Sequence, residues 1–206
     1  MRKLILIRHS LPEIIPSRPA NQWRLSGEGR LRCQWLAARL ASYSIETLIA
    51  SSEPKAQETA QLTADVLGIA WETVEGLHEH DRSSVPFFTS REDFRAAVAE
   101  LFGRPEELVF GAETADQAHA RFTRAVARLL TERTGTLAIV THGTVMTLFV
   151  TRATGLTPLP FWRQLEMPSY AVLSLPVFDL LELIGLEQLH SGCGPHPEES
   201  GDTDQL

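Results

Sequence analysis

Short apolar runs and helical repeats alternate along the first part of the chain. Residues 3–7, 46–50 and 71–74 are rich in apolar and β-branched side chains, as strands of a buried sheet are. Between the first two runs, Leu31, Trp35, Leu36 and Leu40 recur at helical spacing behind Ser26, a candidate N-cap. A second helix is expected over residues 53–67, with Ser52 as its cap and Pro54 in its first turn.

The pattern is interrupted once and then resumes. Residues 78–113 carry Pro86, and we expect them to form an excursion over the predicted sheet, with one short helix at 91–102. Further on we expect a helix at 115–132, a strand at 136–140 and a helix that begins at 144. Two closing strands follow at 170–175 and 178–184, with a turn at Pro176 between them. This alternation predicts an α/β fold, a three-layer sandwich in which helices flank a mostly parallel central sheet.

Length and charge refine this picture. The 206 residues suit one domain, over residues 1–186, followed by an acidic tail at 187–206 that we expect to be disordered. The net charge is −7, but no Lys or Arg follows Arg163, so the acidity belongs to the C-terminal end. A nearly neutral body without a basic stripe argues against nucleic acid as a partner. Two distant cysteines and the lack of a long apolar run predict a cytoplasmic protein with no membrane segment.

Three of the expected strands end in side chains that suggest chemistry. These ends are Arg8-His9-Ser10, Ser51-Ser52 with Lys55 one turn later, and Thr141-His142-Gly143. The carboxyl ends of parallel strands meet at one edge of a sheet, where helix N-termini also point. Two imidazoles, a guanidinium and an ammonium there would suit a phosphoryl dianion, and a neutral imidazole among cations would be a nucleophile toward phosphorus.

Four segments also carry a family resemblance. In order, LIRHS, SSEPKAQETA, LHEH and VTHGTV resemble the motifs of the histidine phosphatase superfamily, the phosphoglycerate-mutase-like proteins. The resemblance covers residues 1–155 and continues more weakly to 184. It implies that His9 is the phosphorylated nucleophile, that Arg8 and His142 bind the phosphoryl group, and that Glu79 is the proton donor.

The chain departs from the common motifs at three places. Ser10 stands where the family usually has Gly after the Arg-His pair, and Ile15 stands near the position of a frequent Asn. Lys55 replaces the Arg of the second motif, as in one branch of the family. Lysine keeps the positive charge for phosphate binding but gives up the bidentate fork of arginine.

These residues predict a metal-independent, cofactor-free phosphomonoesterase of the histidine acid-phosphatase type. It would form a phosphohistidine on His9 and use Glu79 first as acid and then as base. The substrate would be a small phosphorylated metabolite or a phosphoprotein, and the apolar closing strands could form a homodimer edge. A mutase of the same mechanism is the first alternative, although the short excursion favours hydrolysis. A non-catalytic phosphate-binding module is the second.

Three local alternatives accompany this interpretation. Asp81 could replace Glu79 as the acid, since both lie in one charged cluster. His78, Glu79 and His80 could instead hold a metal ion, but no matching ligand pair is apparent elsewhere. The phenylalanines of the excursion are expected to form core beneath it rather than a hydrophobic cradle for substrate; they are Phe87, Phe88, Phe94 and Phe102.

Overall fold

The computed structural model describes residues 2–190 and contains one central sheet. The strands follow the order β3-β2-β4-β1-β5-β6 across the sheet. Strand β5 runs antiparallel to both of its neighbours, whereas the pairs β1–β4, β4–β2 and β2–β3 are parallel. The six strands are β1 Lys3–Arg8, β2 Ile45–Ala50, β3 Ala70–Thr73, β4 Thr136–Thr141, β5 Ser169–Ser174 and β6 Leu180–Ile184.

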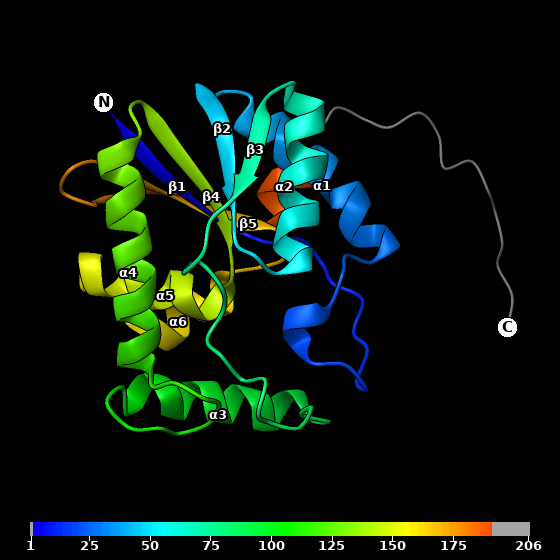
Figure 1. Ribbon diagram of the computed structural model, residues 1–206, viewed down its shortest axis with the longest axis vertical. Helices are drawn as coiled ribbons and strands as arrows, with labels where there is room; N and C mark the ends of the chain where they lie inside the picture. The colour runs from blue at the N-terminus through cyan, green and yellow to red at the C-terminus, as the bar shows by residue number, and fades with distance from the viewer. Residues whose placement is uncertain (1, 191–206) are drawn as a thin grey trace, which may run out of the picture.

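Helices cover both faces of this sheet, because strand residues alternate between two apolar clusters. Leu4 and Leu6 pack with α4, α5 and α6, whereas Ile5 and Ile7 pack on the other side with α1 and α2. Figure 1 shows these two helical layers and α3 lying beyond one end of the sheet. The helices are α1 Gly27–Leu40, α2 Pro54–Leu67, α3 Arg91–Gly103, α4 Ala115–Glu132, α5 Gly143–Thr154 and α6 Pro158–Gln164. The predicted fold class is confirmed.

Several boundaries differ from the expectation. Glu53, not Ser52, is the N-cap of α2, and the Ser52 hydroxyl bonds to Glu75 instead. Strand β6 begins at Leu180 rather than at 178, because Phe178 has a φ of 62° and cannot continue a strand. The sequence pattern also missed the 3₁₀ turn η1 at Ala20–Gln22 and the proline-rich helix α6.

The expected disorder from residue 187 is wrong for its first four residues. Residues Leu186–His190 form the short helix α7, and Leu189 is fully buried in the cluster that contains α1 and α2. Packing of this one leucine explains why order extends past the predicted boundary. The remainder of the predicted tail, residues 191–206, lies outside the described part of the chain.

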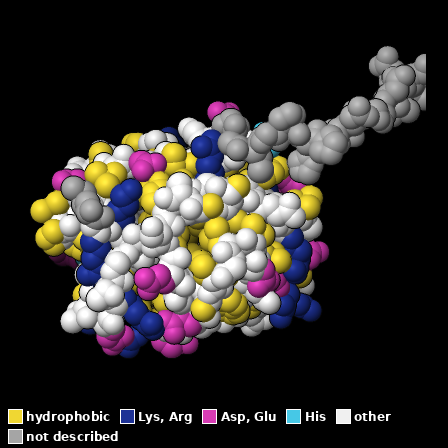
Figure 2. Space-filling view, turned by 90° about the horizontal axis from the view of Figure 1, so that it is seen from above, with side chains coloured by type: hydrophobic (Ala, Val, Ile, Leu, Met, Phe, Trp, Pro, Cys, Tyr) yellow, Lys and Arg dark blue, Asp and Glu magenta, His cyan; other side chains and the backbone are white. Residues whose placement is uncertain are grey.

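The surface is mixed in character. Figure 2 views the molecule from the side away from α3, where basic and acidic side chains lie interspersed rather than in separate fields. None of the helices between residues 2 and 190 combines the length and apolarity needed to cross a bilayer.

Candidate active site

Strand order brings three polar strand ends together. Strand β4 lies between β2 and β1, and its end is paired with Arg8 in register. The pairing continues past the strands, since the backbone N–H of His9 donates to Thr141 and that of Ser51 donates to Val140, both at 2.9 Å. His9, Ser51 and His142 therefore follow three adjacent strands at one edge, as the sequence predicted.

His9 has one ring nitrogen bound and the other available. Its Nδ1 lies 2.7 Å from the carbonyl oxygen of Ser10, and a carbonyl can only accept, so Nδ1 carries the proton. Burial, followed by the charges of Lys55, His142 and Arg8, lowers the pKa of His9 well below its usual value. The ring is therefore neutral, with the lone pair on Nε2, and it lines a cavity of about 640 Å³.

The Arg8 guanidinium is packed under the start of α5. Its Nη1 donates to the carbonyl of Leu165, and its buried Nε has no hydrogen-bond partner among the described residues. A Cβ atom on Gly143 would lie 3.2 Å from both Cζ and Nε of Arg8, so glycine there makes room for the guanidinium. Burial lowers the pKa of Arg8 to about 10, which still leaves the group cationic near neutral pH.

His142 is the N-cap of α5 and is completely buried beside His9. The two ring centroids are 5.1 Å apart. Its Nε2 lies 2.8 Å from the Ser51 hydroxyl and 3.5 Å from a carboxylate oxygen of Glu53, whereas its buried Nδ1 has no partner among the described residues. Burial, then the charge of Lys55, lowers its pKa well below the usual value.

Glu79 lies at the N-terminus of α5. Its Oε2 accepts from the backbone N–H of Thr144, and its Oε1 accepts from those of Val145 and His80, at 3.0–3.2 Å. Burial acts to raise its pKa, but His142, Arg82 and these amides outweigh burial, so the net pKa is lowered. A carboxylate offers about four acceptor positions, and three amides leave about one for a proton.

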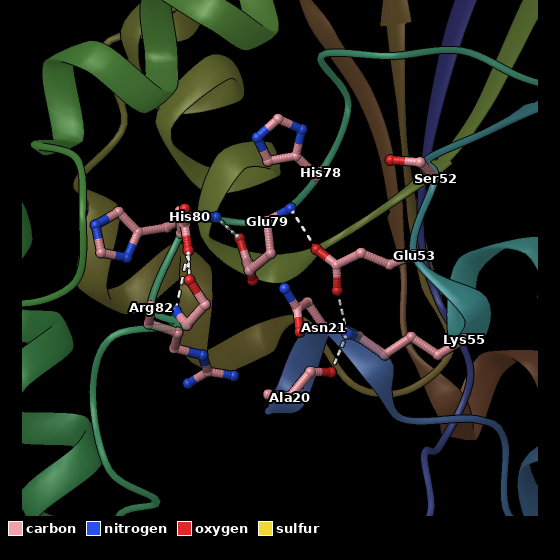
Figure 3. A pocket seen from close by; sticks show the side chains of 11 residues that line it. Ala20, Asn21, Ser52, Glu53, Lys55, His78, Glu79, His80 and Arg82 are labelled. Atoms are coloured by element: carbon pink, nitrogen blue, oxygen red, sulfur yellow. Dashed lines mark hydrogen bonds and ion pairs between the residues drawn. The ribbon is translucent and has the colours of Figure 1, made fainter. Parts of the chain in front are cut away.

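Lys55 is held by a residue that the sequence analysis did not single out. Its Nζ donates to a carboxylate oxygen of Glu53 and, at 2.8 Å, to the Ala20 carbonyl. Figure 3 shows Glu53 between Lys55 and the backbone amide of Glu79, which donates to Glu53 at 2.9 Å. Acidic residues are common at helix N-termini, because they interact favourably with the helix dipole. The position of Glu53 before Pro54 therefore gave little indication that Glu53 belongs to the site.

The buried Glu53–Lys55 pair supports a stability prediction. Lys55→Met should lower the free energy of unfolding by about 3 kcal/mol, because it leaves the Glu53 carboxylate buried without its cation. Urea unfolding measures this loss. The double variant Glu53→Gln/Lys55→Met should recover much of it, since no charge then remains unpaired. Equal losses in the single and double variants would contradict a paired arrangement.

Two further arginines shape the site, and neither was predicted. Arg121 on α4 donates to the backbone carbonyls of Gly76, His78 and Glu79, and it pairs with Glu113 at 2.5 Å. It thereby fixes the segment that carries Glu79. Arg82 lines the same cavity as His9, and its charge acts on both Arg8 and Glu79.

Ser10 fits the position where the resembling motif has glycine. Its hydroxyl donates to the Gly29 carbonyl at 2.7 Å, and its backbone N–H donates to Thr59 Oγ1 at 3.0 Å. Among the described non-glycine residues only Phe178 has a positive φ, so Ser10 needs no left-handed backbone. Glycine at position 29 lets the backbone of Leu11 pass close to α1, because a Cβ atom on residue 29 would lie only 2.1 Å from the Leu11 carbonyl oxygen.

The residues named in the local alternatives lie in different surroundings. Glu79 lines the cavity that contains His9, whereas Asp81 lines a smaller neighbouring pocket and its carboxylate binds Ser83. The His80 ring faces away, with Nε2 at 2.8 Å from the Glu113 carbonyl. Within residues 2–190 no three His, Cys, Asp or Glu side chains are grouped to hold a metal ion. The five predicted site residues are thus brought together, although His142 lies behind the cavity wall.

Solved structures share this fold at low sequence identity. A mycobacterial glucosyl-3-phosphoglycerate phosphatase in complex with VO3 has a TM-score of 0.67 at 19% identity, covering 90% of this chain and 98% of its own. Phosphoserine phosphatase from Entamoeba histolytica, in complex with 3-phosphoglyceric acid, has a TM-score of 0.70 at 18% identity, covering 92% and 100%. "Mycobacterial hydrolase 2" has a TM-score of 0.70 at 15% identity, covering 92% and 97%.

The family assignment rests on the sequence itself. No curated protein is detectably similar in sequence to this chain. The model of the family described as "Histidine phosphatase superfamily (branch 1)" matches residues 4–179, a range that contains every predicted site residue. Because this match spans most of the chain, the chain belongs to branch 1 of the histidine phosphatase superfamily.

Proposed function

We propose that this protein is a phosphatase that hydrolyses a phosphomonoester through a phosphohistidine on His9, without a metal ion. One observation carries the proposal. The Ser10 carbonyl leaves His9 Nε2 as the unprotonated ring atom, and the adjoining Arg8, which lines the same cavity, holds a buried Nε without a partner among the described residues. Buried polar atoms of this kind normally find a partner, and phosphoryl oxygens would supply one.

In the first half-reaction the lone pair of His9 Nε2 attacks phosphorus. The bond from phosphorus to the leaving oxygen breaks, and its electron pair stays on that oxygen. Glu79, when protonated, donates its proton to this oxygen, so that an alcohol departs rather than an alkoxide. Arg8 and Lys55, which line the cavity beside His9, stabilise the negative charge on the remaining phosphoryl oxygens.

In the second half-reaction water attacks the phosphohistidine. The ionised Glu79 accepts a proton from this water, the phosphorus–nitrogen bond breaks, and its electron pair returns to Nε2. Inorganic phosphate leaves, and Glu79 returns to its ionised form by releasing the proton to phosphate or to solvent. The low pKa of His9 keeps its ring neutral and ready for attack again.

Glu79 must become protonated before it can act as an acid. The cations and amides around it lower its pKa in the free protein. A bound phosphoryl dianion engages those same cations and adds like charge beside the carboxylate, and both effects raise the pKa. Substrate binding thus prepares the acid.

Structures that share the fold include phosphatases by their titles, and this supports hydrolysis over mutase chemistry. The expected substrate is a small phosphorylated metabolite or a phosphoprotein, met in the cytoplasm.

The proposal is tested by trapping the intermediate. Rapid quenching during turnover of phenyl phosphate should reveal acid-labile phosphate on the protein, and mass spectrometry should locate it on His9. Phosphate and phenol should then appear in equal amounts, also in the presence of EDTA. Transfer of phosphate between the two hydroxyl positions of phosphoglycerate, without release of inorganic phosphate, would indicate a mutase. Binding of phosphate with no phenol release would indicate a non-catalytic module.

A further inference from the structure

The cavity beside His9 has a polar end, which carries the proposed catalytic residues, and an apolar wall of aromatic side chains. Its volume is about 640 Å³, far larger than one phosphoryl group requires. Arg8, His9, Lys55 and Glu79 supply the polar end, and Arg18, Arg82, Arg91 and Arg95 also line the cavity. Five aromatic side chains from three parts of the chain also line it: Trp23, then Phe87, Phe88 and Phe94 of the excursion, and Trp162.

These rings support one another. Trp23 lies 6.0 Å from Phe87, Phe88 lies 5.5 Å from Phe94, and Phe94 lies 6.0 Å from Trp162, measured between ring centroids. The Trp23 indole N–H is shared between two backbone carbonyls at 3.0 Å, so the ring is fixed in place. The wall is therefore built before any ligand arrives.

The expectation that the excursion's phenylalanines form core is wrong for three of them. Phe87 is 40% exposed, and Phe88 and Phe94 are half-buried at the cavity, whereas Phe102 packs against the main apolar cluster. Leaving several aromatic faces in contact with water is unfavourable, and a contiguous apolar surface of this kind marks a binding site.

Arg82 joins the aromatic wall to the phosphoryl end. Its guanidinium lies over the Phe94 ring, 4.6 Å from the centroid, and its charge also acts on Arg8 and Glu79. A guanidinium in this place can bind a phosphoryl oxygen while its stacked face extends the apolar wall. The wall thus begins where the leaving group of a bound phosphomonoester must lie.

We infer that the substrate is a phosphomonoester whose alcohol carries a large apolar group, preferably an aromatic ring, that packs on this wall. The inference rests on the proposed function, because the position of the leaving group follows from attack by His9. A small polar alcohol would leave the wall hydrated and gain nothing from it. An apolar ring would displace that water and be oriented for in-line departure.

Two primary alkyl esters test the inference directly. Propyl phosphate and 3-phenylpropyl phosphate expel alcohols of nearly the same acidity and differ by a phenyl ring. We expect kcat/KM to be at least about tenfold higher for the phenylpropyl ester. The affinities of the matching phosphonates, measured by titration calorimetry, should show the same preference without any turnover.

Variants of the aromatic wall test whether its side chains cause the preference for the phenylpropyl ester. Phe87→Ala and Phe94→Ala should each reduce the phenylpropyl-to-propyl ratio by about fivefold. The Phe87 change should leave kcat/KM for the propyl ester nearly unchanged, whereas Phe94→Ala also removes the ring beneath Arg82, so only the ratio is compared for that variant. Phe87 is partly exposed, so its replacement should not disturb folding. Leu108→Ala is the matched control, because Leu108 is an exposed apolar residue of the same excursion that does not line the cavity.

The outcomes separate this inference from the proposed function. Equal kcat/KM for the two esters and equal affinity for the two phosphonates would overturn it, even if His9 is phosphorylated. A preference that survives both phenylalanine variants would also overturn it. Tighter binding of phenylpropylphosphonate without hydrolysis of either ester would support the apolar ligand class and contradict the phosphatase proposal.

Discussion

Replacing His9 with alanine should lower kcat for any phosphomonoester by at least about 10⁴-fold, because no other group can accept the phosphoryl group. Water in the same cavity is a poorer nucleophile than Nε2, and the covalent intermediate that divides hydrolysis into two steps is lost. Steady-state phosphate release measures the effect, and quenched samples of the variant should contain no acid-labile phosphate.

The fold should survive this change. His9 is a single buried side chain at the end of β1, and the smaller alanine leaves the backbone N–H bond to Thr141 intact. His119→Ala is a matched control, since this histidine lies on α4 and its ring faces Thr123 rather than the cavity. A folded His9→Ala protein with near-normal turnover would refute the phosphohistidine mechanism.

Replacing Glu79 with glutamine should slow phosphorylation of His9 in a way that depends on the leaving group. An alkyl phosphate expels a weakly acidic alcohol that needs a proton, whereas nitrophenyl phosphate expels an anion that is already stable. We expect a loss on the order of 10² for the alkyl ester and a much smaller loss for the nitrophenyl ester. Single-turnover rates on both substrates isolate this step.

The structure predicts a second effect of the same substitution. The Glu79 carboxylate accepts from the amides of Thr144, Val145 and His80, and a glutamine NH₂ group would face at least one of these donors. Leaving a buried N–H unpaired costs about 1–3 kcal/mol of stability. This loss affects both substrates alike, so the ratio of their rates, rather than either rate alone, reports proton donation.

Asp81→Asn provides the matched control for Glu79→Gln. Asp81 is the neighbouring acid, and its carboxylate accepts from the amide and hydroxyl of Ser83. Its replacement should leave the ratio of alkyl to nitrophenyl rates unchanged. Equal slowing on both substrates by Glu79→Gln would mean that Glu79 only binds or positions, and a changed ratio for Asp81→Asn would transfer the acid role to Asp81.

Local sequence patterns determined the elements and the motif residues. Apolar runs and helical spacing located most strands and helices, and Ser26 was correctly identified as a cap, with Gly29 N–H donating to it at 3.0 Å. Arg8, His9 and His142 could be identified because each directly follows or ends a strand. These patterns involve only residues that are close together in the sequence, so they can be recognised without knowledge of the fold.

The tertiary structure alone decided what those residues contact. The strand order sets His142 beside His9, and the burial of Glu53 ties Lys55 to a carboxylate that the sequence did not mark as part of the site. The aromatic wall is assembled from Trp23, Phe94 and Trp162, which are separated by long stretches of chain. Periodicity shows that a side chain is apolar, but whether it meets core or cavity depends on which distant segment packs against it.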